Sequence, residues 1–149
     1  MRKFLLTAIK VVSLLSCFSQ MPGSLDPTFG NAGVSATAPR GMSTHKMMIQ
    51  PDGKLIVLGT VPHPERYLDA AVARYTASGA VDRSFSGDGI FIEDALNVGI
   101  FEADIALQSD GKLLLAGLKG AAGDVTNLIV YRYNQDGSRD HSLTFEELA

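Results

Sequence analysis

Histidine and carboxylate side chains are the groups in this chain that could bind a metal ion, and one such pair is close together in sequence. His63 and Glu65 lie two residues apart in the segment PHPER. Zinc accepts both types of ligand, but a zinc site needs three or four of them. The other two histidines, His45 and His141, fall in unrelated parts of the sequence. We therefore predict no metal site and no cofactor.

Several aspartates lie near glycines and could offer oxygen ligands to a hard cation such as Ca²⁺. They are Asp52, Asp82, Asp88, Asp110, Asp136 and Asp140. No stretch has the D-x-D-x-D-G density of a calcium loop. Aspartate also accepts hydrogen bonds from the backbone two residues further on, which stabilises turns. The sequence therefore favours turn capping over calcium binding.

The sequence contains none of the short motifs that mark common enzyme active sites. We find no nucleophile elbow, glycine-rich phosphate loop, paired-histidine zinc motif or cysteine–histidine pair. The formal net charge is −3, and no strongly basic face is apparent, which argues against nucleic acid as a partner. We expect a protein that is not an enzyme and whose partner is an unknown ligand or protein.

The chain contains an internal repeat. QPDGKLIVLG at residues 50–59 returns as QSDGKLLLAG at residues 108–117, an offset of 58. The same offset relates Arg74 to Arg132, Gly79 to Gly137 and Asp82 to Asp140. Upstream, LDPTFGNAGV from Leu25 matches VDRSFSGDGI from Val81 at an offset of 56. Self-similarity at a fixed period indicates repeated supersecondary units that stack on one another.

Each unit is built from short strand and turn signals. The segments PDGK and SDGK place Gly53 and Gly111 where a tight turn favours positive φ. Apolar runs such as LIVLG follow these turns, and DAAVARYT alternates as a half-buried strand does. Each period supplies four short antiparallel strands, which is typical of propeller blades.

The predicted fold is therefore all-β and propeller-like, with about two four-stranded antiparallel blades. The blades span roughly residues 24–81 and 82–140, within a repeat region of 21–149 that ends in a short C-terminal tail. A closed propeller needs at least about four blades, so two blades make an incomplete ring. Outer faces that lack a neighbour would be apolar, and we expect the chain to self-associate.

The composite pattern resembles the bacterial delta-60 repeat, which is similar to propeller-type repeats. The matching segments are D-x-T-F from Asp26, the stretch 50–59, and R-Y followed by G and D after Arg74, and the pattern begins again near Ser84. The resemblance covers about residues 24–140 and implies an exported or surface protein without catalytic residues. It gives a structural role to the repeat positions Phe29, Gly53, Arg74, Phe85, Gly111 and Arg132. After Asp140 the sequence HSLTFEELA departs from the pattern, because the F-x-x-x-G segment is missing.

The first twenty residues differ from the rest. Arg2 and Lys3 precede an apolar, acid-free segment, as in a secretory signal peptide. LLSC also resembles a bacterial lipobox, in which Cys17 would become the lipidated first residue; cleavage after Ser19 fits the pattern equally well. The alternative is an amphipathic N-terminal helix that stays on the protein. We expect residues 1–20 to be a signal peptide or lipoprotein signal, and the protein to be exported: periplasmic, extracellular or lipid-anchored in the cell envelope. Contact with a membrane is expected only through a lipid anchor at Cys17.

One loop distinguishes the two units. TVPHPERYL at residues 60–68 aligns with LKGAAGDVT at 118–126, and the two share no residue although their flanking strands repeat closely. Repeat scaffolds keep their strands and vary their loops where they bind. The candidate recognition residues are His63, Glu65, Arg66 and Tyr67. The alternative is a connecting loop with no role in binding.

The sequence thus predicts an exported propeller-like repeat module with a binding or structural role. Two alternatives stay open. The chain is either a truncated remnant or terminal fragment of a longer delta-60 repeat surface protein, or a fragment of a propeller hydrolase or lyase with its catalytic residues on missing blades.

Overall fold

The computed structural model describes residues 23–36, 39, 41–64, 68–93, 100–121 and 124–143. These residues form two antiparallel sheets. The first contains β1 (Ser43–Ile49), β2 (Leu55–Pro62), β3 (Leu68–Tyr75) and β4 (Ile90–Glu93), paired in chain order. The second contains β5 (Ile100–Leu107), β6 (Leu113–Ala121) and β7 (Asp124–Tyr133), also in chain order. The all-β, propeller-like fold predicted from the repeat is confirmed.

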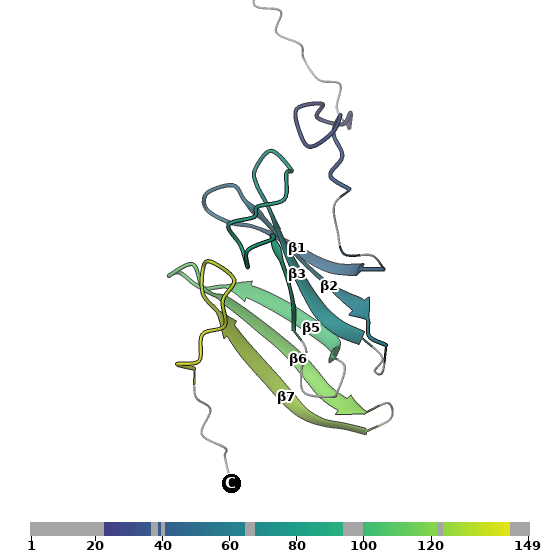
Figure 1. Cartoon of the computed structure of the whole chain (residues 1–149), viewed down its shortest axis with the longest axis vertical. Coiled ribbons are helices and arrows are strands. Elements are labelled where there is room, and N and C mark those ends of the chain that lie inside the picture. The colour runs from purple at the N-terminus through teal and green to yellow at the C-terminus, as the bar shows by residue number, and fades with distance from the viewer. Residues whose placement is uncertain are drawn as a thin grey trace, which may run out of the picture.

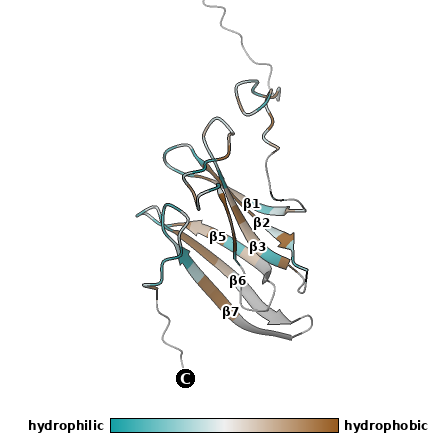
Figure 2. Ribbon diagram, in the orientation of Figure 1, coloured by the Kyte–Doolittle hydropathy of each residue, from teal (hydrophilic) through white to brown (hydrophobic). Residues whose placement is uncertain are grey.

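The two sheets lie against each other in the way that neighbouring blades do (Figure 1). β5, the first strand of the second sheet, contacts β1, β2 and β3 of the first. Figure 2 shows apolar colour along the central strands of both sheets and hydrophilic colour at the turns. The described residues contain no helix that is long and apolar enough to cross a membrane.

The second unit has three described strands where four were predicted. β4 pairs with β3, with Val72 opposite Phe91, so the first unit extends to residue 93, beyond the boundary predicted at residue 81. Residues aligned with β4 at the repeat offset would begin at position 148, outside the described part of the chain. Within the described part, β7 is therefore an edge strand of the second sheet, as is β5.

The two hairpin turns follow the prediction made for their glycines. Gly53 and Gly111 have φ of 81° and 80°. In both turns the glycine N–H donates to the carbonyl of the glutamine three residues earlier, at 2.9 Å for both Gly53 to Gln50 and Gly111 to Gln108. A positive φ is strained for residues with a Cβ, so glycine is favoured at both positions.

The core lies between the two sheets. Ile56, Leu58 and Val72 of the first sheet pack with Ile105 and others of the second, all nearly inaccessible to solvent. Side chains alternate along a strand, so every second residue of β2 and β3 reaches this interface. Burial of this apolar area is the main stabilisation that joins the two units.

Their equivalent repeat positions predict that Phe29 and Phe85 fill equivalent buried sites, and this prediction is only half correct. Each ring lies against a glycine of a neighbouring turn, Phe29 at Gly79 and Phe85 at Gly137. Phe85 is fully buried, but Phe29 is only half-buried. The reason is that Phe85 packs within the core between the two sheets and contacts Phe91, with ring centroids 5.6 Å apart. Phe29 precedes the first sheet and has a sheet on one side only among the described residues.

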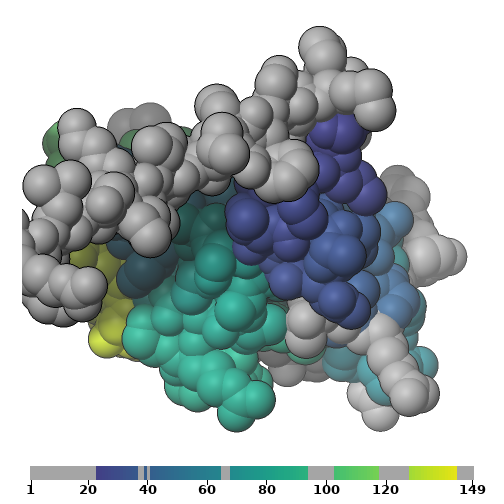
Figure 3. Space-filling view, turned by 90° about the horizontal axis from the view of Figure 1, so that it is seen from above, coloured from purple at the N-terminus to yellow at the C-terminus, as the bar shows by residue number. Residues whose placement is uncertain are grey.

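The segment before the first sheet repeats the loop that joins the units. The Gly30 N–H donates to the Ser78 carbonyl at 2.7 Å, and the Ser86 N–H donates to the Asp136 carbonyl at the same distance. In the view from above, residues 23–36 lie directly beside the first unit (Figure 3). Each of these two loops is thus hydrogen-bonded to a turn of the unit that follows it.

Candidate functional site

At the end of the third strand of each unit, an arginine pairs with an aspartate and a serine of the segment that follows. We call each of these groups an arginine–aspartate corner. Arg74 Nε donates to Asp82 Oδ2 at 2.8 Å, and its Nη2 donates to Ser84 Oγ at 3.0 Å. The second corner repeats this geometry with Arg132, Asp140 and Ser142, at 2.7 and 2.9 Å. The resemblance to the delta-60 repeat implies a structural role for Arg74 and Arg132. In the structure both pair with their own aspartate.

Both corner aspartates are held ionised by their surroundings. Burial alone would raise the pKa of Asp82, but hydrogen bonds from Ser84 and Lys54, together with the charge of Arg74, hold it well below its usual range. The hydrogen bond from Lys112 contributes most to the lowered pKa of Asp140, followed by those from Ser142. The lysines of the two DGK turns, Lys54 and Lys112, thus contact the corners at 3.1 and 2.7 Å.

The first corner also connects the two units. Arg74 Nη1 donates to the carbonyl oxygen of Gln135 in the second unit, at 2.5 Å. The guanidinium of Arg74 also lies over the ring of Phe85, 4.5 Å from its centroid. A buried arginine that makes hydrogen bonds in three directions fixes the relative position of the segments it joins. The geometry of Arg74 therefore fits a structural role.

A second polar cluster joins the sheets, and sequence reasoning missed it. Glu93, buried at the end of β4, accepts a hydrogen bond from the Tyr133 hydroxyl. Glu93 also pairs with Arg139 at 3.2 Å, and the Arg139 guanidinium lies 4.0 Å from the Tyr131 ring centroid. Burial raises the pKa of Tyr133, and the neighbouring Glu93 raises it further. The sequence feature that could have indicated this cluster is the acidic residue Glu93, directly after the apolar run IFI.

The loop proposed for recognition connects β2 to β3. These two strands pair up to Pro62 opposite Leu68, where the ladder ends. His63 is half-buried at its base, and its Nε2 lies 4.0 Å from Asp69 Oδ2. The other candidate residues, Glu65, Arg66 and Tyr67, lie outside the described residues, as does Cys17.

The histidines are separate in the structure. His45 Nε2 lies 3.0 Å from Thr60 Oγ1 on the first sheet, whereas His141 is exposed beside the second corner. Among the described residues, no group of three or more histidine, cysteine, aspartate or glutamate side chains could hold a metal ion. The described aspartates of the turns instead accept backbone hydrogen bonds two residues on, as Asp88 does from the Ile90 N–H at 3.0 Å.

Comparison with known protein families gives one match. A family described as "Domain of unknown function (DUF5122) beta-propeller" matches residues 50–85 and 108–143. A search of curated proteins and a search of solved structures each found no match. Each matched stretch runs from the hairpin turn through the arginine–aspartate corner, and ends at Phe85 in the first unit and at Leu143 in the second. The family repeat is thus the same unit that the internal offset defines.

Proposed function

We propose that this β-propeller-type repeat protein is an exported module of the delta-60 type, with a binding or structural role and no catalytic one. The observation that supports the proposal is a contrast within the chain. The hairpin turns and the arginine–aspartate–serine hydrogen bonds of the corners recur in both units, whereas the loops 60–68 and 118–126 share no residue. A scaffold that repeats its strands and varies its loops is suited to binding at those loops.

The loop chemistry fits recognition of a polar or charged ligand. His63, Glu65, Arg66 and Tyr67 combine both signs of charge with an aromatic ring in five residues. Arginine and tyrosine are enriched in protein interfaces because each offers both a flat contact surface and hydrogen-bond donors. At the base of the loop, His63 lies 4.0 Å from Asp69, which is buried in β3.

The binding role can be tested by giving the first unit the loop of the second. The variant combines His63→Ala, Pro64→Ala, Glu65→Gly, Arg66→Asp and Tyr67→Val, which are the residues at 121–125. We expect the wild-type protein to cosediment with washed cell envelopes of the source organism, and the variant to bind about tenfold more weakly, since loss of one or two interface anchors has about this effect.

A matched control is Arg83→Ala, which also removes a charge but lies at the opposite end of β3, on an exposed loop. It should bind like the wild type. If the loop variant binds as well as the control, recognition does not use this loop, and the binding proposal fails.

The export proposal makes a separate prediction about the N-terminus. We expect protein recovered from the producing cell to begin at Cys17, with a lipid attached, or at Gln20, because the leader would be removed at one of the two candidate sites. N-terminal sequencing and intact mass would distinguish the two. An intact Met1 terminus in the soluble fraction contradicts both.

A further inference from the structure

The interface between the two sheets has a definite composition at repeat positions. From the first sheet it uses Ile56, Leu58, Ala70 and Val72, and from the second it uses Ile105, Leu107, Leu113 and Leu115. Strand pairing places each set on one face, because residues opposite each other in a sheet point the same way: Leu58 is opposite Val72, and Ile105 is opposite Leu115. Two faces of different composition therefore meet here.

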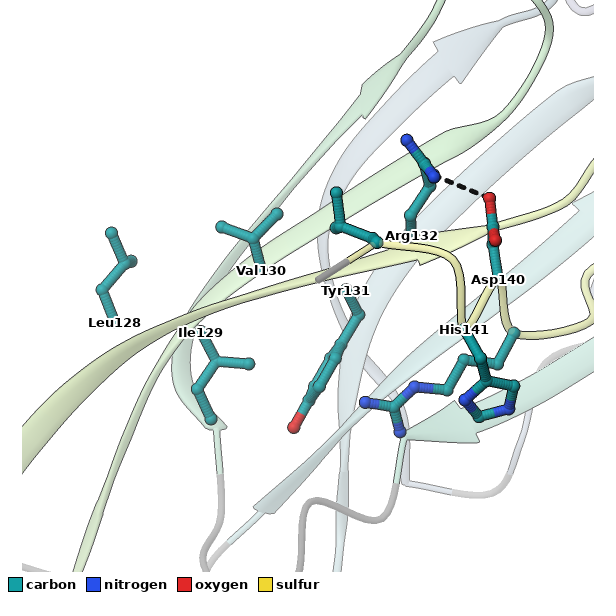
Figure 4. A pocket seen from close by; sticks show the side chains of 9 residues that line it. Leu128, Ile129, Val130, Tyr131, Arg132, Asp140 and His141 are labelled. Carbon is teal, nitrogen blue, oxygen red and sulfur yellow. Dashed lines mark hydrogen bonds and ion pairs between the residues drawn. The ribbon is translucent and has the colours of Figure 1, made fainter. Parts of the chain in front are cut away.

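The outward face of the second sheet carries apolar residues at the same repeat positions as the inward face of the first sheet. The residues 58 positions after Ile56, Leu58, Ala70 and Val72 are Leu114, Ala116, Leu128 and Val130. Leu128 is 71% exposed, whereas its counterpart Ala70 is fully buried. Figure 4 shows Leu128 and Val130 on one side of β7, with Arg132 joined to Asp140 beside them. Leu128, Val130, Arg132 and Asp140 line a groove of about 420 Å³ along β7, which Ile129 and Tyr131 from the other side of the strand also line.

The outward face of the first sheet carries apolar residues at the same repeat positions as the inward face of the second sheet. The residues 58 positions before Ile105, Leu107, Leu113 and Leu115 are Met47, Ile49, Leu55 and Val57. Met47 is 60% exposed and Ile49 is 68% exposed, whereas Ile105 is 1% exposed. The exposed part of this face lies on β1 and β2, because Ala71 and Ala73 of β3, on the same side of the sheet, are buried. The chain thus presents, on opposite sides, the outward face of the second sheet and the β1–β2 part of the matching face of the first.

We propose that these two outward faces bind each other between copies of this chain, head to tail. The face of Leu114, Leu128 and Val130 in one copy receives the face of Met47, Ile49 and Val57 in the next, in the geometry of the internal interface. The occupant is a second copy because the internal interface shows which surface fits each face. The contact uses neither the loop 60–68 nor the N-terminal leader. An experiment that contradicts this contact would therefore leave the proposed function unaffected, and the reverse also holds.

Charge supports the same pairing. Lys46 Nζ contacts Asp104 Oδ1 across the two units at 2.5 Å, and these residues occupy equivalent repeat positions, 58 apart. In the head-to-tail contact, the equivalent pair is Asp104 of one copy and Lys46 of the next, again with opposite charges. The Asp104 side chain is 69% exposed, which leaves room for a second lysine beside it.

One constraint follows from the repeat. In this arrangement the Asp140–Leu143 segment of one copy and the Asp26–Phe29 segment of the next would take the same place, since both correspond to the Asp82–Phe85 segment. One of them must move aside, so we expect an association of about micromolar strength and not a tight one. The contact is also heterologous, so it continues into larger assemblies unless a ring closes.

The test uses sedimentation velocity of the full chain over a micromolar concentration series. Leu128→Glu and Met47→Glu place a charge on either face, and each should weaken association about tenfold. Arg83→Ala is the control, because it lowers the net charge by one as the glutamate variants do, while Arg83 is exposed in the loop between β3 and β4 and lies on neither outward face. It should associate like the wild type. Circular dichroism checks that each variant is folded.

A charge-exchange experiment separates contacts between copies from contacts within one. Lys46→Glu alone and Asp104→Lys alone each place like charges together both within and between copies, and each should associate about fivefold more weakly. A mixture of the two restores opposite charges only between copies, so the mixture should associate more strongly than either variant alone.

Monomeric wild-type protein at micromolar concentration would overturn the proposal. So would association that Leu128→Glu and Met47→Glu leave unchanged, or a mixture that sediments as its separate components do.

Discussion

Replacing Phe85 by alanine is expected to cost about 3–5 kcal/mol of folding free energy, because a large aromatic side chain is lost from a closed part of the core. Phe85 is fully buried. It lies against Phe91, beneath the guanidinium of Arg74, and on the turn of the second unit at Gly137. The substitution therefore removes contacts within the first unit and between the two units together.

The matched control is Phe29→Ala at the corresponding position of the preceding segment. Phe29 is half-buried and has contact with the Gly79 turn, so we expect a loss of only about 1–2 kcal/mol. Urea unfolding followed by circular dichroism would measure both, and the chain contains no tryptophan to report by fluorescence. Equal losses for the two variants would show that the buried and half-buried sites do not differ in energy as their packing indicates.

Much of this fold could be predicted from the sequence because each turn and strand pattern occurs twice, once in each repeat unit. The turns of Gly53 and Gly111 need positive φ, and each is followed by an apolar strand. The asymmetry between Phe29 and Phe85 could not be predicted in this way. Identical residue types at equivalent repeat positions differ in burial when one of them has a neighbouring unit on only one side.

The contacts between the units were harder to foresee. Glu93 and Arg139 come from parts of the chain that the repeat offset does not relate, so no pattern in the sequence pairs them. Arg74 and Arg132 look equivalent in sequence, and their corners have the same geometry. Only the structure shows that Arg74 also contacts Gln135, which lies 61 residues away.

This difference leads to the second large expected effect. Arg74→Ala should cost about 3 kcal/mol, because it leaves the buried Asp82 carboxylate without its closest cation and removes a hydrogen bond to the second unit. Arg132→Ala is the matched control and should cost clearly less. Each aspartate keeps its lysine, Lys54 or Lys112, so the difference comes from the arginines. Arg132 is more exposed than Arg74, and its hydrogen bonds to Asp140 and Ser142 stay within the second unit. Urea unfolding at pH 7 measures both, and equal losses would contradict a role for Arg74 in joining the units.

The dependence of this loss on pH separates its charge component from its packing component. The pKa of Asp82 lies below its usual value in the folded protein, so the ionised carboxylate adds stability above its unfolded pKa of about 4. That contribution is lost progressively as the pH falls below about 4, where the unfolded state takes up the proton first. The stability gap between the wild type and Arg74→Ala should therefore narrow between pH 7 and pH 3. A gap of equal size at both pH values would mean that Arg74 stabilises the protein through its contacts with Phe85 and Gln135, and not through its charge on Asp82.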